Sequence, residues 1–205
     1  MKKFELTNEF VTNMFGTKLF RIRALVEFGD VEAGELGGYV EKESNLGHDD
    51  NAWVYGNAQV SGNARVYGNA RVYGNAWVYG DAQVSGDAQV YGNAWVYGDA
   101  QVSGDAQVSG DARVSGNARV CGNGDYAYAH GFGSVNRTTT FFRLKDGGVG
   151  VRCGCFYGTL AQFRDKIRET HGETKKAQEY LMLADLMELR FEEDENEVGN
   201  RKYVE

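Results

Sequence analysis

Histidine is the side chain best suited to proton transfer near neutral pH, and this chain contains three of them. His171 stands beside Gly172 at the expected end of a helix, and His48 lies in a segment expected to cap a repeat array. We expect both to be surface or capping residues. His130 follows an aromatic stretch, residues 126–129, and is the one histidine that we consider as a general base. A structural role is favoured over a catalytic one for it as well.

Cysteine thiolates could bind a soft metal, but their arrangement here predicts no metal site. Cys153 and Cys155 would point to one side of a strand and form half of such a site, yet no second cysteine pair or nearby histidine completes it. We expect them to belong to a core. Cys121 is expected on an outer surface, and three cysteines without a secreted framework predict free thiols. We therefore predict neither a bound metal nor a cofactor.

A six-residue repeat must position any functional group in the middle of the chain. Residues 51–122 contain twelve consecutive copies of Asn/Asp-Ala-X-Val-Tyr/Ser-Gly. In an extended segment Ala and Val point to one side, and X and Tyr/Ser point to the other. Gly followed by Asn or Asp suits a tight corner. Each copy is therefore predicted to form one short strand and one corner, stacked on its neighbours.

The array resembles the hexapeptide-repeat family, in which an aliphatic residue recurs every six positions with a small residue at a fixed offset. The segment from Val54 to Gln59 and its successors match this pattern. The resemblance implies a mainly β fold: a left-handed parallel β-helix of triangular section, with three copies per coil and about four regular coils. The family includes acyltransferases, carbonic anhydrases and inert scaffolds.

Three copies per coil place residues eighteen apart on one outer face. One face then carries Trp77, Tyr79, Trp95 and Tyr97, with Arg113 placed to cap the tryptophans by a cation–π contact. A second face carries Trp53 and three tyrosines, and the third is the most polar. The predicted binding residues are Trp77, Tyr79, Trp95, Tyr97, Arg113, Tyr55, Tyr73 and Tyr91. The alternatives are that another subunit or the flanking segments cover the aromatic patch, or that the rings only stack between coils.

Two further segments, residues 36–41 and 153–160, resemble uncharacterised bacterial and prophage hexapeptide-repeat proteins, some labelled as transferases. Hexapeptide acyltransferases use a histidine base and a loop that projects from the array, and the carbonic anhydrases need three histidines. The array from residue 51 to 122 contains no histidine and no inserted loop. This departure argues against both enzyme activities.

The flanking sequences predict smaller elements around the β-helix. We divide the chain into N-terminal strands and a capping coil (1–50), the β-helix (51–124) and a C-terminal α+β segment (125–205). Residues 19–25 alternate as a strand. Residues 138–144 and 150–157 form two strands of a β-hairpin, with 145–148 as its turn. Thr159 is a helix N-cap, and a second helix runs from about Thr174 to Phe191, before an acidic tail that begins at Glu192.

Composition narrows the function classes. The net charge is −7, and the array is close to neutral, so no duplex nucleic acid is expected as a partner. No signal peptide or membrane-spanning run is recognised, which predicts a cytoplasmic protein. We predict a non-catalytic binding scaffold, a homo-oligomer (trimer or dimer), encoded by a phage or prophage. It would inhibit a host defence component by binding a protein or sequestering a nucleotide. An acyltransferase using acyl-CoA with His130 as base, and a phage structural protein, are the alternatives.

Overall fold

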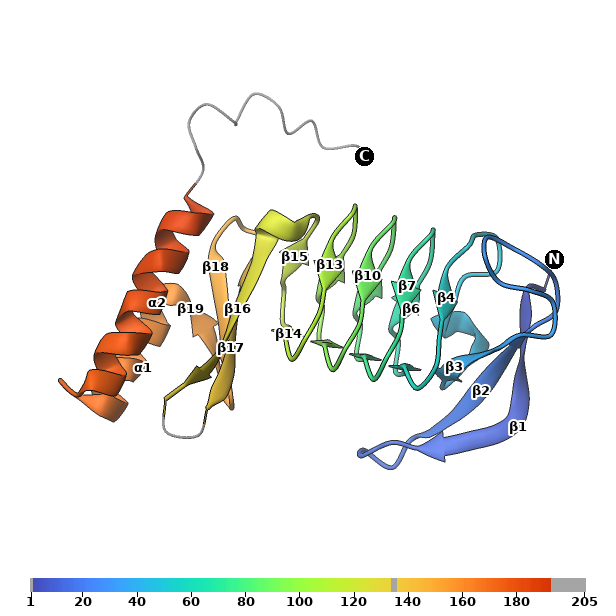
Figure 1. The fold of residues 1–205 in the computed structure, drawn as a ribbon, viewed down its shortest axis with the longest axis horizontal. Helices are drawn as coiled ribbons and strands as arrows, with labels where there is room; N and C mark the ends of the chain where they lie inside the picture. Colours follow the sequence, from blue (N-terminus) through green and yellow to red (C-terminus); the bar gives the residue numbers. More distant parts are fainter. Residues whose placement is uncertain (1, 134–135, 193–205) are drawn as a thin grey trace, which may run out of the picture.

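The six-residue repeat forms twelve two-residue strands at the centre of the molecule (Figure 1). The structure, a computed structural model, describes residues 2–133 and 136–192. Each repeat contributes its variable residue and its Val to one strand, and the glycine that follows has a positive φ from Gly56 to Gly116. The strands are β4 (Trp53–Val54), β5 (Gln59–Val60), β6 (Arg65–Val66), β7 (Arg71–Val72), β8 (Trp77–Val78), β9 (Gln83–Val84), β10 (Gln89–Val90), β11 (Trp95–Val96), β12 (Gln101–Val102), β13 (Gln107–Val108), β14 (Arg113–Val114) and β15 (Arg119–Val120).

Every third strand pairs in parallel, which confirms the three predicted faces. The sheets are β4-β7-β10-β13, β6-β9-β12-β15, and a third that contains β5-β8-β11-β14. Paired residues are eighteen apart, as in the pairing of Trp95 with Trp77 and Arg113. The protein is thus mainly β, with a parallel β-solenoid of four regular turns at its centre.

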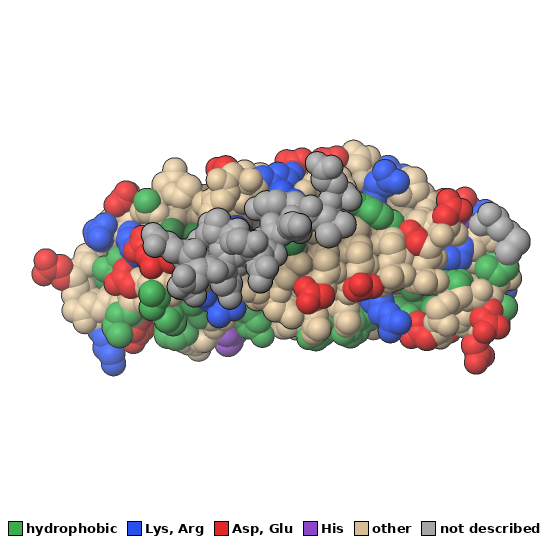
Figure 2. Space-filling view, turned by 90° about the horizontal axis from the view of Figure 1, so that it is seen from above, with side chains coloured by type: hydrophobic (Ala, Val, Ile, Leu, Met, Phe, Trp, Pro, Cys, Tyr) green, Lys and Arg blue, Asp and Glu red, His purple; other side chains and the backbone are tan. Residues whose placement is uncertain are grey.

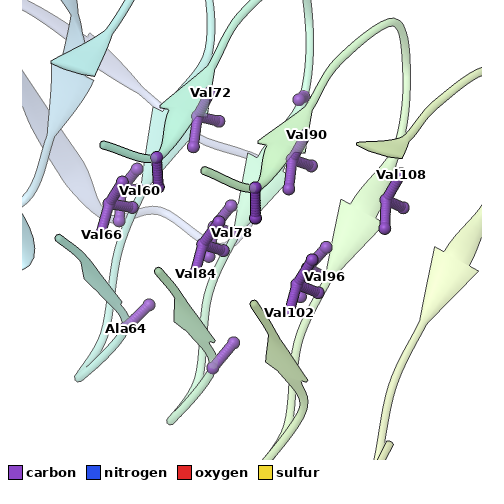
Figure 3. Packing of buried hydrophobic residues seen from close by; sticks show 14 of the residues in the cluster. Val60, Ala64, Val66, Val72, Val78, Val84, Val90, Val96, Val102 and Val108 are labelled. Atoms are coloured by element: carbon purple, nitrogen blue, oxygen red, sulfur yellow. The ribbon is translucent and has the colours of Figure 1, made fainter. Parts of the chain in front are cut away.

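The solenoid interior is built from the Ala and Val of each repeat. All of these side chains from Ala52 to Val120 are 0% exposed, and the valines of successive turns lie in rows (Figure 3). Burying this apolar surface is the main favourable contribution that each turn makes, and no single turn could bury it without its neighbours.

An irregular turn closes the N-terminal end, as predicted. β3 (Leu36–Val40) pairs in parallel with β5, and Leu46 forms a parallel bridge with Val66 just after the short 3₁₀ helix η1 (Glu43–Asn45). β2 (Lys18–Ala24), close to the predicted strand, pairs antiparallel with β3 and with β1 (Phe4–Thr12). The sheet of β5 therefore has seven strands, in the order β1-β2-β3-β5-β8-β11-β14.

Trp53 pairs with Arg71 of its predicted face but, unlike the other residues at this position of the repeat, is fully buried. Its side chain is 0% exposed, because Phe4 and Phe28 of the N-terminal segment pack on it with ring centroids 6.2 and 5.3 Å away. The repeat pattern alone gives no sign of this cover, since both phenylalanines lie outside the array.

A four-stranded antiparallel sheet follows the solenoid and the 3₁₀ helix η2 (Asn123–Asp125). It consists of β16 (Tyr126–Phe132), β17 (Arg137–Arg143), β18 (Val149–Cys153) and β19 (Phe156–Thr159). The predicted hairpin between β17 and β18 is confirmed. The single strand expected over residues 150–157 is wrong, because the chain turns at Gly154 and Cys155 and pairs β18 with β19.

Two helices cover the outer side of this sheet, at the end of the molecule (Figure 1). α1 (Leu160–His171) begins at the predicted N-cap Thr159, whose side chain accepts a hydrogen bond from the Gln162 amide. α2 (Lys175–Phe191) begins after Thr174, which caps it in the same way. Phe142 and Leu144 of the sheet side facing the array join the solenoid core and close its C-terminal end. The acidic tail from residue 193 onward lies outside the described residues.

Candidate interaction face

Strands β8 and β11 place two tryptophans and two tyrosines in a stacked block. Trp77 and Trp95 are paired residues, with ring centroids 5.2 Å apart and an interplanar angle of 6°. Tyr79 and Tyr97, two residues further along the chain and directly after each strand, stack at 4.9 Å and 1°. The rings are parallel because successive solenoid turns repeat the same backbone geometry at the strand spacing. We call these four side chains the aromatic face.

Both ends of the aromatic face are covered by other parts of the chain. Phe15, in the turn between β1 and β2, lies 6.3 Å from the Trp77 ring and 5.4 Å from the Tyr79 ring. At the other end the Arg113 guanidinium lies 4.7 Å from the Trp95 ring centroid, which confirms the predicted cation–π contact. Arg152 of β18 lies 5.7 Å from the Tyr97 ring centroid.

Each of the four rings therefore has a neighbour on two sides, and all four are only partly exposed. Ring edges and hydroxyl groups remain to contact another molecule. The flanking segments thus cover part of the aromatic face, which was one of the alternatives predicted from the sequence.

The turn beside the aromatic face is itself apolar and exposed. Met14 is 66% exposed and Phe15 is 58% exposed, although Phe15 contacts Trp77 and Tyr79. Figure 1 shows the β1–β2 hairpin projecting below one end of the solenoid, with β16 and β17 at the opposite end. Contiguous exposed apolar side chains on a soluble protein are typical of an interaction site. Met14, Phe15 and Arg152 are not among the residues predicted from the sequence, in which the one local signal is an apolar pair between Asn13 and Gly16.

Burial of the aromatic face affects the tyrosine hydroxyls. It raises the pKa of Tyr79 to about 12, with a smaller contribution from Tyr97, while the positive charges of Arg152 and Arg113 oppose the increase. The Tyr79 hydroxyl therefore stays protonated near neutral pH and can donate a hydrogen bond.

The other three predicted binding residues belong to a different sheet, that of β4, β7, β10 and β13. Tyr73 and Tyr91 stack there at 4.8 Å and 0°. The Tyr55 hydroxyl donates to Asp30 at 3.2 Å, and burial, with the Asp30 charge as a further cause, raises its pKa to about 12. The structure thus divides the eight predicted binding residues into two separate sets.

The residues considered for catalysis or metal binding do not form a common site. His130 is exposed, and its Nδ1 lies 2.8 Å from Thr138 Oγ1 on the neighbouring strand. Cys153 Sγ accepts a hydrogen bond from Thr139, whereas Cys155 is exposed in the turn after β18. The prediction that the two cysteines share one side of a strand is wrong, because that turn separates them. Within residues 2–133 and 136–192, no three His, Cys, Asp or Glu side chains are grouped to hold a metal.

A polar hollow of about 750 Å³, which no sequence pattern predicts, lies beside the irregular first turn. Lys42 and Arg65 line it together with Glu43, Asp49 and Asp50. Basic and acidic groups therefore face the same space, so the hollow has no clear preference for the charge of a ligand. Two of these carboxylates are also engaged within the chain, since Lys3 Nζ contacts Asp50 Oδ1 at 3.2 Å and Lys2 pairs with Glu43.

The surface seen from above has a mixed character. Seen from above, backbone and uncharged polar side chains prevail along the solenoid, with acidic and basic side chains scattered over it and at both ends (Figure 2). No described helix is long and apolar enough to cross a membrane.

Comparison with known families supports the repeat architecture. Residues 58–72, 64–80, 70–86, 82–98, 88–104 and 106–123 match the family described as YdcK Beta solenoid repeat. All of these matches lie within residues 51–124, so they bear on the solenoid and not on the flanking hairpin, sheet or helices. Comparison with curated protein sequences gives no match.

Proposed function

We propose that this protein is a β-solenoid scaffold that works by binding a partner protein across the aromatic face. The observation that carries the proposal is the continuity of Trp77, Tyr79, Trp95 and Tyr97 with the exposed turn that contains Phe15. Tryptophan, tyrosine and arginine are the residues that most often dominate the energy of protein interfaces.

A protein partner fits the ring geometry better than a nucleotide does. A base binds an aromatic side chain by stacking on the face of its ring. Here one face of each ring is stacked on the ring of the next turn, an arginine lies over Trp95 and over Tyr97, and Phe15 contacts Trp77 and Tyr79 at the other end. Ring edges and hydroxyls suit contacts with side chains and backbone of a protein, and Arg113 and Arg152 favour an acidic group at one end.

The more specific role suggested by the sequence is the inhibition of a host defence component by a phage or prophage protein. A protein-binding face is what such an inhibitor requires, so we retain this role as the biological form of the proposal. We do not carry the acyltransferase forward, because residues 51–122 contain neither a histidine nor an inserted loop. The alternative role as a phage structural protein predicts that this chain is incorporated into virions. Mass spectrometry of purified phage particles would test this.

Site-specific photo-crosslinking in the native host tests the proposal. A photoreactive amino acid in place of Met14 should give a discrete adduct with another protein, identified by mass spectrometry. The matched control carries it in place of Tyr67, which is 37% exposed on another sheet of the solenoid. An adduct with a second copy of the chain would show that the face is an oligomer interface instead. Equal labelling from both positions, or none from Met14, would contradict a specific partner.

A further inference from the structure

Helix α2 carries a second apolar stripe, on the side opposite its buried face. Met182, Leu186 and Leu189 are 71%, 54% and 68% exposed. Their spacing of four and three residues aligns them along one side of the helix. The buried side consists of Ala177, Tyr180, Ala184, Met187 and Phe191. This helix is therefore apolar on two sides, although the described chain covers only one.

The position of α2 makes the stripe available to another molecule. The helices lie on the outer side of the C-terminal sheet, at the end of the molecule away from the N-terminal hairpin (Figure 1). α1 packs along one flank of α2, where Arg164 contacts Asp185 and Glu188, each at 2.8 Å. The solenoid would therefore not obstruct a second molecule that approached the end of the rod.

The charges of α2 run against its own dipole. Lys175 and Lys176 lie in its first turn, and Glu192 follows its last residue. In the sequence, five further acidic residues come after Glu192, four of them by position 197. A helix dipole favours the opposite order, with acidic groups at the N-terminus and basic groups at the C-terminus. The basic residue of the last turn, Arg190, is directed towards the solenoid, where its Nη2 lies 3.5 Å from the Asn123 carbonyl oxygen.

An antiparallel copy of the same helix matches both the stripe and the charges. If Met182 lies against Leu186 of a second copy, the pair is centred on position 184. The same centre brings Lys176 to the same height along the axis as Glu192 of the second copy, and Leu189 to that of Glu179, whose aliphatic stem can pack on it. Basic and acidic ends then meet at both ends of the helix pair, as an isologous two-fold interface requires.

We propose that the protein forms a two-fold dimer through α2, with the helices antiparallel and the Met182–Leu186–Leu189 stripe at its centre. Three side chains form a small apolar core, below the size typical of tight interfaces. The dimer should accordingly be weak, with a dissociation constant of about 10–100 µM.

Sedimentation equilibrium over about 1–500 µM protein tests the interface. The wild type should dimerise within this range, and the Met182→Glu/Leu186→Glu variant should bind at least about tenfold more weakly, since it buries charge in the apolar centre. Glutamate is a good helix former, so α2 itself should be preserved, which circular dichroism would verify. The Leu25→Glu variant, changed at a site 42% exposed near the other end of the chain, should dimerise like the wild type. A monomeric wild type, or an unaffected double variant, would overturn the proposal.

Cysteine crosslinking with a short bismaleimide tests the orientation, in a Cys155→Ser background that removes the exposed native thiol. In the antiparallel pair, residue 186 lies about 6 Å along the axis from its counterpart, and residue 175 about 27 Å from its own, at 1.5 Å per residue. Leu186→Cys should therefore crosslink and Lys175→Cys should not. Equal crosslinking at both positions would indicate parallel helices and refute the arrangement.

Discussion

Replacing the corner glycine Gly80 by alanine should destabilise the solenoid more than the same change at Gly56. Both residues have a positive φ, +75° at Gly80 and +59° at Gly56. A Cβ at Gly80 would lie 3.0 Å from the backbone nitrogen of Gly98 in the next turn, whereas a Cβ at Gly56 would have nothing within 4 Å. The two positions therefore share the backbone strain but differ in the contact between turns.

The expected magnitudes follow from this difference. A non-glycine residue at positive φ costs about 1–2 kcal/mol, and the lower entropy of the unfolded alanine chain offsets about 0.4–1 kcal/mol of it. Gly56→Ala should thus cost about 1 kcal/mol. At Gly80 the neighbouring turn cannot move away freely, because the Asp81 amide donates to the Gly98 carbonyl oxygen at 2.9 Å. Overpacking of this kind adds about 1–3 kcal/mol, so Gly80→Ala should cost about 2–4 kcal/mol.

Equilibrium denaturation in urea measures the difference, with far-ultraviolet circular dichroism and tryptophan fluorescence followed together. Coincident transitions would justify a two-state free energy for both variants. The free energy of unfolding should fall further in Gly80→Ala than in Gly56→Ala, by about 1–3 kcal/mol. Equal losses would refute the reasoning, because they would show that backbone strain alone decides the cost of a corner substitution.

Three other properties are open to direct measurement. Burial raises the pKa of Tyr79 to about 12 from an ordinary value of 10, so the stability that its protonated form contributes is fully present below pH 10 and is lost as pH rises through 12. The denaturation midpoint of Tyr79→Phe should therefore fall less steeply over that range than the midpoint of the wild type. Identical slopes would contradict the raised pKa of Tyr79. Thr159→Ala removes the N-cap hydrogen bond from the Gln162 amide and should lower the free energy of unfolding in urea by about 1 kcal/mol. An unchanged denaturation midpoint would disprove this prediction. Val90→Ala, at a side chain 0% exposed, should cost about 2–3 kcal/mol, against almost nothing for the exposed Gln107→Ala.

The sequence predicts the solenoid well because each of the twelve copies of the repeat indicates the same local structure. A buried Val, a buried Ala and a glycine corner recur at fixed spacing, so strand positions and the register of Trp77 with Trp95 follow directly. The starts of the two helices are equally predictable from the sequence, since Thr159 and Thr174 are both N-caps. Each of these features depends on residues close in sequence or at a constant separation.

The features missed from the sequence depend on contacts without any such period. Trp53 is buried by phenylalanines from the N-terminal segment, and Phe15 reaches the aromatic face from a hairpin whose first strand, β1, had not been predicted. The sequence does not predict the turn after Cys153, because residues 150–157 are apolar enough to resemble one continuous strand. The contact of Arg113 with Trp95 was predictable because both belong to the array, whereas Arg152 comes from the sheet beyond it.

The α2 stripe and the aromatic face should affect binding of a partner differently, so the two proposals can be tested independently. The α2 stripe lies on the helices outside the C-terminal sheet, whereas the aromatic face lies on the solenoid, so a dimer would leave two copies of that face unoccupied. An oligomeric partner could then engage both, and its apparent affinity would exceed that of a single face by linkage alone. Met182→Glu/Leu186→Glu should therefore lower the affinity for an oligomeric partner but leave the affinity for one partner subunit unchanged. A change in the aromatic face or in Phe15 should lower both affinities together.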